Sequence, residues 1–96
     1  MRIALVIGST VSTIKDETLQ GRKLLIVQPA NTKGIPSGEP YVAVDTVSAG
    51  RGDLVLVTEY SSARYTGFTK NLPIDAVIVG VIDSLEEGGE YTYQKR

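Results

Sequence analysis

Runs of β-branched and aliphatic residues, separated by short turn-forming stretches, dominate the hydrophobic pattern of this chain. Such runs of four to eight residues between Gly, Pro, Asn and Asp are typical of β-strands. The connections contain Gly21, the Asn31–Pro40 stretch, Gly50, Gly52, Asn71 and Pro73. The pattern therefore predicts five strands, at Arg2–Thr13, Lys23–Gln28, Tyr41–Val47, Asp53–Glu59 and Asp75–Asp83.

Helical periodicity is almost absent from the sequence. Only Ser61-Ser62-Ala63-Arg64-Tyr65 is compatible with one helical turn, in which a serine serves as the N-cap. Gly8 and Gly80 fall inside the first and last predicted strands, where glycine often marks a bulge or a sharp bend at a barrel corner. The sequence therefore predicts an all-β fold, a small five-stranded OB-like β-barrel with one short helical turn.

Three of the predicted strands are apolar on both faces, whereas a lone small barrel alternates apolar and polar residues along each strand. These strands contain the runs Leu24–Val27, Leu54–Val57 and Ala76–Ile82. One face fills the barrel, so the other needs a cover, and a neighbouring subunit is the simplest one. The alternative is that these strands are merely sticky and make the protein prone to aggregation.

Two polar segments lie outside the predicted strands. Asn31–Pro40 is rich in turn formers and is interpreted as an exposed hairpin loop. We assign residues 1–84 to the barrel domain and residues 85–96 to a polar C-terminal tail. Tyr91 and Tyr93 would share one face if the tail is an extended strand that adds to a sheet edge, and disorder of the tail is the alternative.

Size and composition limit the functions available to the chain. Its 96 residues allow one domain, which is small enough to be marginally stable alone. It contains neither Cys nor His, so disulfides and the commonest soft metal ligands are excluded, and oligomerisation is the expected supplement. The apolar run after Arg2 is broken by Gly8, and no run is long enough to span a bilayer. We expect a soluble, cytoplasmic protein without membrane association.

Catalytic chemistry has little support in this sequence. No serine or threonine stands in a nucleophile elbow, and Cys and His are missing. Four aspartates, Asp45, Asp53, Asp75 and Asp83, sit at strand ends, where a carboxylate more often bonds a turn amide than shares a proton. We therefore expect no enzyme activity, no catalytic residues, no metal and no cofactor.

The Gly50-Arg51-Gly52-Asp53 segment permits several interpretations. A phosphate-binding P-loop requires a different spacing and a following helix, whereas a strand follows here. A cell-adhesion role for Arg-Gly-Asp is disfavoured in a chain without Cys and without a signal segment. The remaining interpretation is structural, with Gly50 and Gly52 supplying unusual backbone angles in a tight connection.

Binding of single-stranded nucleic acid is the rival hypothesis for an OB-like barrel, because such barrels combine basic grooves with exposed aromatic residues. Tyr60, Tyr65 and Phe68 cluster in sequence around Arg64 and Lys70. The net charge of −1 counts against this function.

An ordered series of short motifs resembles the EutN/CcmL family of bacterial microcompartment vertex proteins. The resemblance extends from the N-terminus to about Asp83. Its motifs are Met1-Arg2-Ile3-Ala4, Gly21 with Lys23-Leu24-Leu25, Val44-Asp45-Thr46-Val47-Ser48-Ala49-Gly50, Gly52-Asp53-Leu54-Val55-Leu56-Val57, Ser61-Ser62-Ala63-Arg64, and Asn71-Leu72-Pro73-Ile74-Asp75-Ala76.

The resemblance implies a non-catalytic shell subunit that forms a homopentamer and caps the vertices of a microcompartment in the cytoplasm, together with hexameric shell proteins. It also implies that the loop Ser48, Ala49, Gly50, Arg51 and Gly52 lines the five-fold axis, where small residues let backbones approach closely. Arg64, Asn71 and Asp75 are candidates for the subunit or shell interface.

This chain departs from the family pattern at three places, one of which is the C-terminal tail with Tyr91 and Tyr93, unlike the short ends of the family. Family members commonly have Val-Gly-Ala-Gly where this chain has Val47-Ser48-Ala49-Gly50, and often Gly before Ser61, where this chain has Tyr60.

Overall fold

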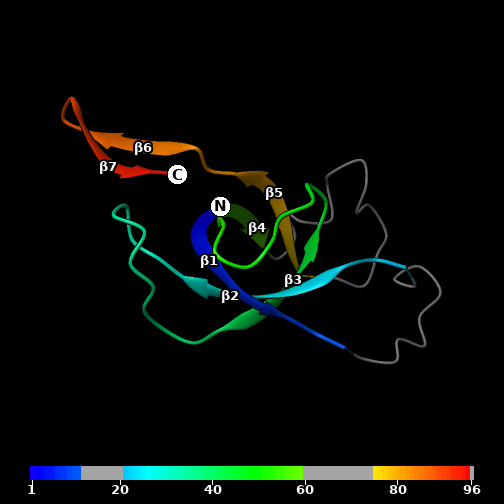
Figure 1. The fold of residues 1–96 in the computed structure, drawn as a ribbon. Coiled ribbons are helices and arrows are strands. Elements are labelled where there is room, and N and C mark those ends of the chain that lie inside the picture. The colour runs from blue at the N-terminus through cyan, green and yellow to red at the C-terminus, as the bar shows by residue number, and fades with distance from the viewer. Residues whose placement is uncertain (12–20, 60–74, 96) are drawn as a thin grey trace.

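The computed structural model describes residues 1–11, 21–59 and 75–95, and these residues are built entirely from strands and their connections (Figure 1). The five predicted strands are confirmed, and no strand end shifts by more than four residues. The strands of the barrel are β1 (Arg2–Ser9), β2 (Leu24–Pro29), β3 (Tyr41–Asp45), β4 (Leu54–Glu59) and β5 (Ala76–Val81).

The strands close into a barrel in the order β1-β2-β3-β5-β4, so that β1 pairs with both β2 and β4. All neighbours are antiparallel except β3 and β5, which run parallel through only two residue pairs, Val44 with Val77 and Asp45 with Ile78. The Thr46 hydroxyl donates to the Ile78 carbonyl oxygen at 2.7 Å and extends this short seam. The closed five-stranded sheet confirms the predicted barrel, and the predicted helical turn lies outside the described residues.

Alternate residues of each strand fill the interior of the barrel. The side chains there are aliphatic and of small or medium size, which suits the narrow interior of a five-stranded barrel. The buried core consists of Ala4, Val6, Leu25, Val27, Ala43, Ala49, Val55, Val57, Ala76 and Ile78.

A second apolar cluster lies on the outer side of the sheet, across β2, β3 and β5. Val44 and Val77 are paired across the parallel seam and are almost fully buried, and Leu24 and Val79 pack against them. Apolar residues therefore occupy both faces of β2 and β5, as predicted, and also of β3, which the sequence did not single out.

Two bulges bend the barrel at the glycines that the sequence singled out. Between β1 and β2 the register shifts between Val6 and Gly8, so that Ile7 is the additional residue. Between β4 and β5, Leu56 pairs with Gly80 and Val57 with Ile78, so that Val79 is additional. Bulges increase local twist and allow a small sheet to close on itself.

The C-terminal segment forms a separate two-stranded sheet. Strands β6 (Ser84–Glu87) and β7 (Glu90–Gln94) make a hairpin beside the β2–β3 loop, to one side of the barrel (Figure 1). Of the two alternatives for this segment, the extended conformation is therefore the one observed, although the strands pair with each other and do not add to an edge of the barrel sheet.

Contacts between the hairpin and the β2–β3 loop hold it in place. The Thr92 hydroxyl donates to the Thr32 carbonyl oxygen at 2.5 Å, and the Thr32 hydroxyl donates to Glu87 at 2.9 Å. Gly34 has a positive φ of 79°, and a Cβ atom built on it would lie only 2.8 Å from the Tyr93 ring. The hairpin thus depends on the absence of a side chain at Gly34.

Candidate functional site

The β3–β4 loop, residues 46–53, contains Ser48–Gly52, the segment that the family resemblance assigned to the five-fold axis. Asp45 accepts hydrogen bonds from the backbone amides of Val47 and Ala49, at 3.0 and 3.2 Å. Asp53 accepts one from the Gly50 amide at 2.9 Å. Both aspartates therefore bond turn amides, as expected for carboxylates at strand ends.

The same loop is anchored to the body of the barrel. The ammonium group of Lys23 donates to the Ala49 carbonyl oxygen at 2.6 Å and lies 3.7 Å from the carboxylate of Asp45. The Ala49 side chain is fully buried in the core, and the Gly52 amide donates to the Val6 carbonyl oxygen. The loop is therefore a rigid cover at one end of the barrel.

The backbone of this loop differs from the sequence prediction at one position. Gly52 has a φ of 92°, in the region that favours glycine, but Gly50 does not. Ser48 has a φ of 59° and is the only non-glycine residue with positive φ in the described part of the chain. The prediction that Gly50 supplies an unusual angle is wrong, because the two hydrogen bonds to Asp45 turn the backbone two residues earlier, at Ser48.

The five candidate axis residues differ in what they can present to another molecule. Ala49 is buried and Gly50 is half-buried, whereas Ser48, Arg51 and Gly52 are exposed. Arg51 forms no hydrogen bond or ion pair with any residue that the structure describes. The exposed side chains of the loop are therefore one hydroxyl and one unpaired guanidinium.

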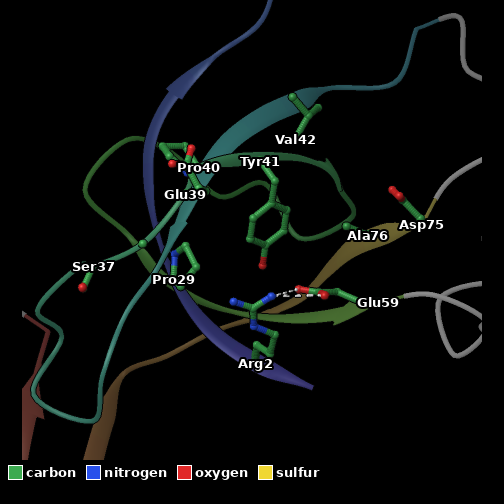
Figure 2. Close-up of a pocket in the computed structure, with 11 residues that line it drawn as sticks. Arg2, Pro29, Ser37, Glu39, Pro40, Tyr41, Val42, Glu59, Asp75 and Ala76 are labelled. Atoms are coloured by element: carbon green, nitrogen blue, oxygen red, sulfur yellow. Dashed lines mark hydrogen bonds and ion pairs between the residues drawn. The ribbon is translucent and has the colours of Figure 1, made fainter.

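An open groove of about 620 Å³ lies at the other end of the barrel (Figure 2). It is formed where β1, β3 and β5 begin and where β2 and β4 end. Arg2 crosses it to reach Glu59, with a nitrogen-to-oxygen distance of 3.0 Å, and its guanidinium lies 5.5 Å from the centre of the Tyr41 ring. The remaining lining includes Pro29, Ser37, Gly38, Glu39, Pro40, Val42, Asp75 and Ala76.

Tyr41 places a buried hydroxyl group in this groove. The hydroxyl oxygen has no hydrogen-bond partner among the described residues. Burial, reinforced by the nearby Glu59 carboxylate and opposed by Arg2, raises the pKa of Tyr41 far above its usual range. Tyr41 is therefore neutral at physiological pH and cannot serve as a base.

The structure brings some of the predicted site residues together and separates others. Ser48, Ala49, Gly50, Arg51 and Gly52 form one continuous loop, while Asp75 is exposed at the edge of the groove at the opposite end. Arg64 and Asn71 lie outside the described residues. The grouping of Asp75 with those two residues is therefore still a prediction.

Sequence reasoning missed the role of Lys23. It belongs to the quoted Gly21–Leu25 motif, but its contact with Ala49 spans 26 residues of sequence. Lys23 immediately precedes β2, which pairs with β3, the strand that leads to the loop, and this pairing brings Lys23 close to Ala49.

The described residues contain neither a candidate metal site nor a candidate membrane-spanning helix. Within 1–11, 21–59 and 75–95, no three Asp or Glu side chains are grouped closely enough to hold a metal ion. In the same ranges, no helix is long and apolar enough to cross a membrane.

Comparison with known proteins gives matches along nearly the whole chain. Residues 1–83 match the family described as ethanolamine utilisation protein EutN/carboxysome. The vertex protein GrpN of Rhodospirillum rubrum, a bacterial microcompartment shell protein, is 46% identical over 86 residues, which cover 90% of this chain and 97% of GrpN. The carboxysome shell vertex protein CcmL of a Synechocystis species is 43% identical over 96 residues, covering 100% of this chain and 96% of CcmL.

The fold agrees with these relatives. A solved structure of GrpN from Rhodospirillum rubrum, described as a pentameric microcompartment shell protein, superposes with a TM-score of 0.81 at 46% identity. The superposition covers 91% of this chain and 99% of that one. The barrel and its connections are thus shared with a protein that assembles as a pentamer.

Proposed function

The chain belongs to the EutN/CcmL family, and on that premise we propose that it is a structural shell protein whose pentamers cap the vertices of a bacterial microcompartment. The observation that carries the proposal is the match, over nearly the full length of both chains, to a pentameric shell protein of the same fold. It places the protein in the cytoplasm, within the shell of a microcompartment. Its function is to close that shell, without catalysis and without a cofactor.

An outward-facing apolar row on the barrel supports self-assembly. Ile26 of β2 pairs with Val42 of β3. On the other side of β2, Ile26 lies opposite both Ile7 and Gly8, because β1 has its bulge there. Ile7 and Val42 are 38% and 45% exposed. We assign this row to the boundary between neighbouring subunits, because contiguous exposed apolar side chains commonly mark interfaces.

The β3–β4 loop is the part that we place around the five-fold axis. Four of its residues, Ser48, Ala49, Gly50 and Gly52, are small, so five copies of the backbone can approach closely. The rigid anchoring by Lys23, Asp45 and Asp53 suits a loop that must repeat identically five times. Asp75, with Arg64 and Asn71, is assigned to contacts at the subunit or shell boundary.

Hexameric shell proteins are the partners that this function requires. Hexagonal tiles alone form flat sheets, and a closed polyhedron needs five-fold units at its corners. A pentamer of this chain therefore needs edges that fit such tiles. The rival function, binding of single-stranded nucleic acid, rested on aromatic and basic residues that lie outside the described residues.

Native mass spectrometry tests the assembly. We expect a species with five times the 10.3 kDa mass of one chain at micromolar concentration. Co-expression with a hexameric shell protein should give closed particles by electron microscopy, whereas the hexamer alone should give open sheets or tubes. A stable monomer or dimer, or particles that close equally well without this chain, would contradict the proposal.

A pair of matched variants tests the assigned boundary. Val42→Asp places a carboxylate in the apolar row and should shift the pentamer towards monomer on dilution, because burying an unpaired charge is costly. Ile35→Asp is the control, since Ile35 is 56% exposed but lies in the β2–β3 loop. If both variants remain pentameric while circular dichroism shows intact strands, the row is not the subunit boundary.

A further inference from the structure

One positive charge of the β3–β4 loop is left without a partner. Asp45 is engaged by two loop amides and by Lys23, and Asp53 by the Gly50 amide and by Lys95, whose ammonium lies 3.7 Å away. Arg51 is exposed and unpaired within the described part of the chain. The acidic groups of the loop are thus neutralised internally, and the charge that it presents outward is that of Arg51.

The surroundings of Arg51 leave its side chain room to bind a ligand. Gly50 and Gly52 flank it, and a Cβ atom built on either glycine would meet no other atom within 4 Å. Two residues before Arg51, Ala49 is fixed in the core and held by Lys23. An exposed guanidinium therefore stands on a backbone that is held in place at Ala49.

We propose that the five Arg51 side chains of the pentamer form a ring that binds one oxyanion, such as a phosphate group, on the five-fold axis. This inference rests on the axial placement of the loop proposed above. Cyclic symmetry brings like charges together, and an anion on the axis neutralises that repulsion while it gains several charge-assisted hydrogen bonds. The planar guanidinium matches the geometry of phosphate oxygens, and rings of Arg or Lys select anions in protein pores.

The stoichiometry of binding distinguishes a ring from separate surface charges. Inorganic pyrophosphate is the probe, titrated into the pentamer at low ionic strength and followed by isothermal titration calorimetry and native mass spectrometry. We expect one pyrophosphate per pentamer, and at least tenfold weaker binding in Arg51→Gln. Lys33→Gln is the matched control, because it removes the same charge from an exposed residue of the β2–β3 loop, and it should bind like the parent.

Each contrary result identifies which idea fails. Five anions per pentamer, or an equal loss in both variants, would mean that the charges attract anions independently, and the ring would be wrong. A wild-type pentamer that binds no pyrophosphate would also overturn the ring while leaving the proposed shell function intact. A wild-type chain that forms no pentamer would overturn the proposed function itself.

Discussion

Replacing Gly34 with alanine should release the C-terminal hairpin from the barrel. The new Cβ atom would lie 2.8 Å from Cδ1 of Tyr93, closer than non-bonded carbon atoms approach, so the ring must move. Relieving such a contact in a packed site costs about 1–3 kcal/mol. Alanine at a φ of 79° adds about 1–2 kcal/mol of backbone strain.

Gly21 provides a control with the same backbone strain. Its φ is also 79°, but a Cβ atom there would meet nothing within 4 Å. Gly21→Ala should therefore carry the strain without the clash. The free energy of unfolding should therefore differ between the two variants by about 1–3 kcal/mol, and this difference measures the clash with Tyr93 alone.

Thermal denaturation at matched protein concentration measures this difference, because 1 kcal/mol corresponds to about 4–8 °C in a domain of this size. Limited proteolysis with chymotrypsin tests whether the destabilisation arises in the C-terminal hairpin. Cleavage after Tyr91 and Tyr93 should accelerate in Gly34→Ala and remain at the wild-type rate in Gly21→Ala. Equal melting temperatures and equal cleavage rates in the two variants would refute the reasoning that Tyr93 packs on Gly34.

Two further predictions concern the β3–β4 loop. Lys23→Met keeps the apolar stem but removes the hydrogen bond to Ala49, and should lower the free energy of unfolding by about 1 kcal/mol, measured by chemical denaturation. Lys33→Met, at an exposed position in the β2–β3 loop, should change it little, and an equal effect would contradict the anchoring role. Ser48→Gly should raise the melting temperature, because glycine adopts the positive φ of this position without strain. After the greater flexibility of glycine in the unfolded chain is subtracted, the expected net gain in the free energy of unfolding is about 0.5–1 kcal/mol. Ser37→Gly, at an exposed loop residue without positive φ, should lower it, and a rise of the same size there would count against the strain argument.

The barrel could be predicted from the sequence because its determinants are local. Each strand carries a run of β-branched residues, and the bulges fall at Gly8 and Gly80, the two glycines that interrupt those runs. The apolar residues on both faces of β2, β4 and β5 were also visible as continuous runs. The pentameric assembly was expected from the family resemblance, because a single chain does not show it.

The details that escaped prediction depend on contacts between distant segments. Glu86 and Glu87 do not favour a strand by propensity, and β6 and β7 are held by contacts of Thr92 and Tyr93 with a loop 60 residues earlier. The positive φ of Ser48 follows from hydrogen bonds to Asp45, which sequence alone does not assign. Both cases show tertiary contacts overriding local preference.

The strand order of the barrel has a consequence for how the chain folds as it is made. Strands β1, β2 and β3 can pair as soon as residue 45 has emerged, but the second edge of β1 waits for β4, where Arg2 pairs with Val57. The parallel seam between β3 and β5 can close only after residue 78 has been synthesised. Contacts so distant in sequence slow folding, and they leave strand edges open in the meantime. A cell that makes this protein therefore has to keep nascent chains apart until the last barrel strand is in place.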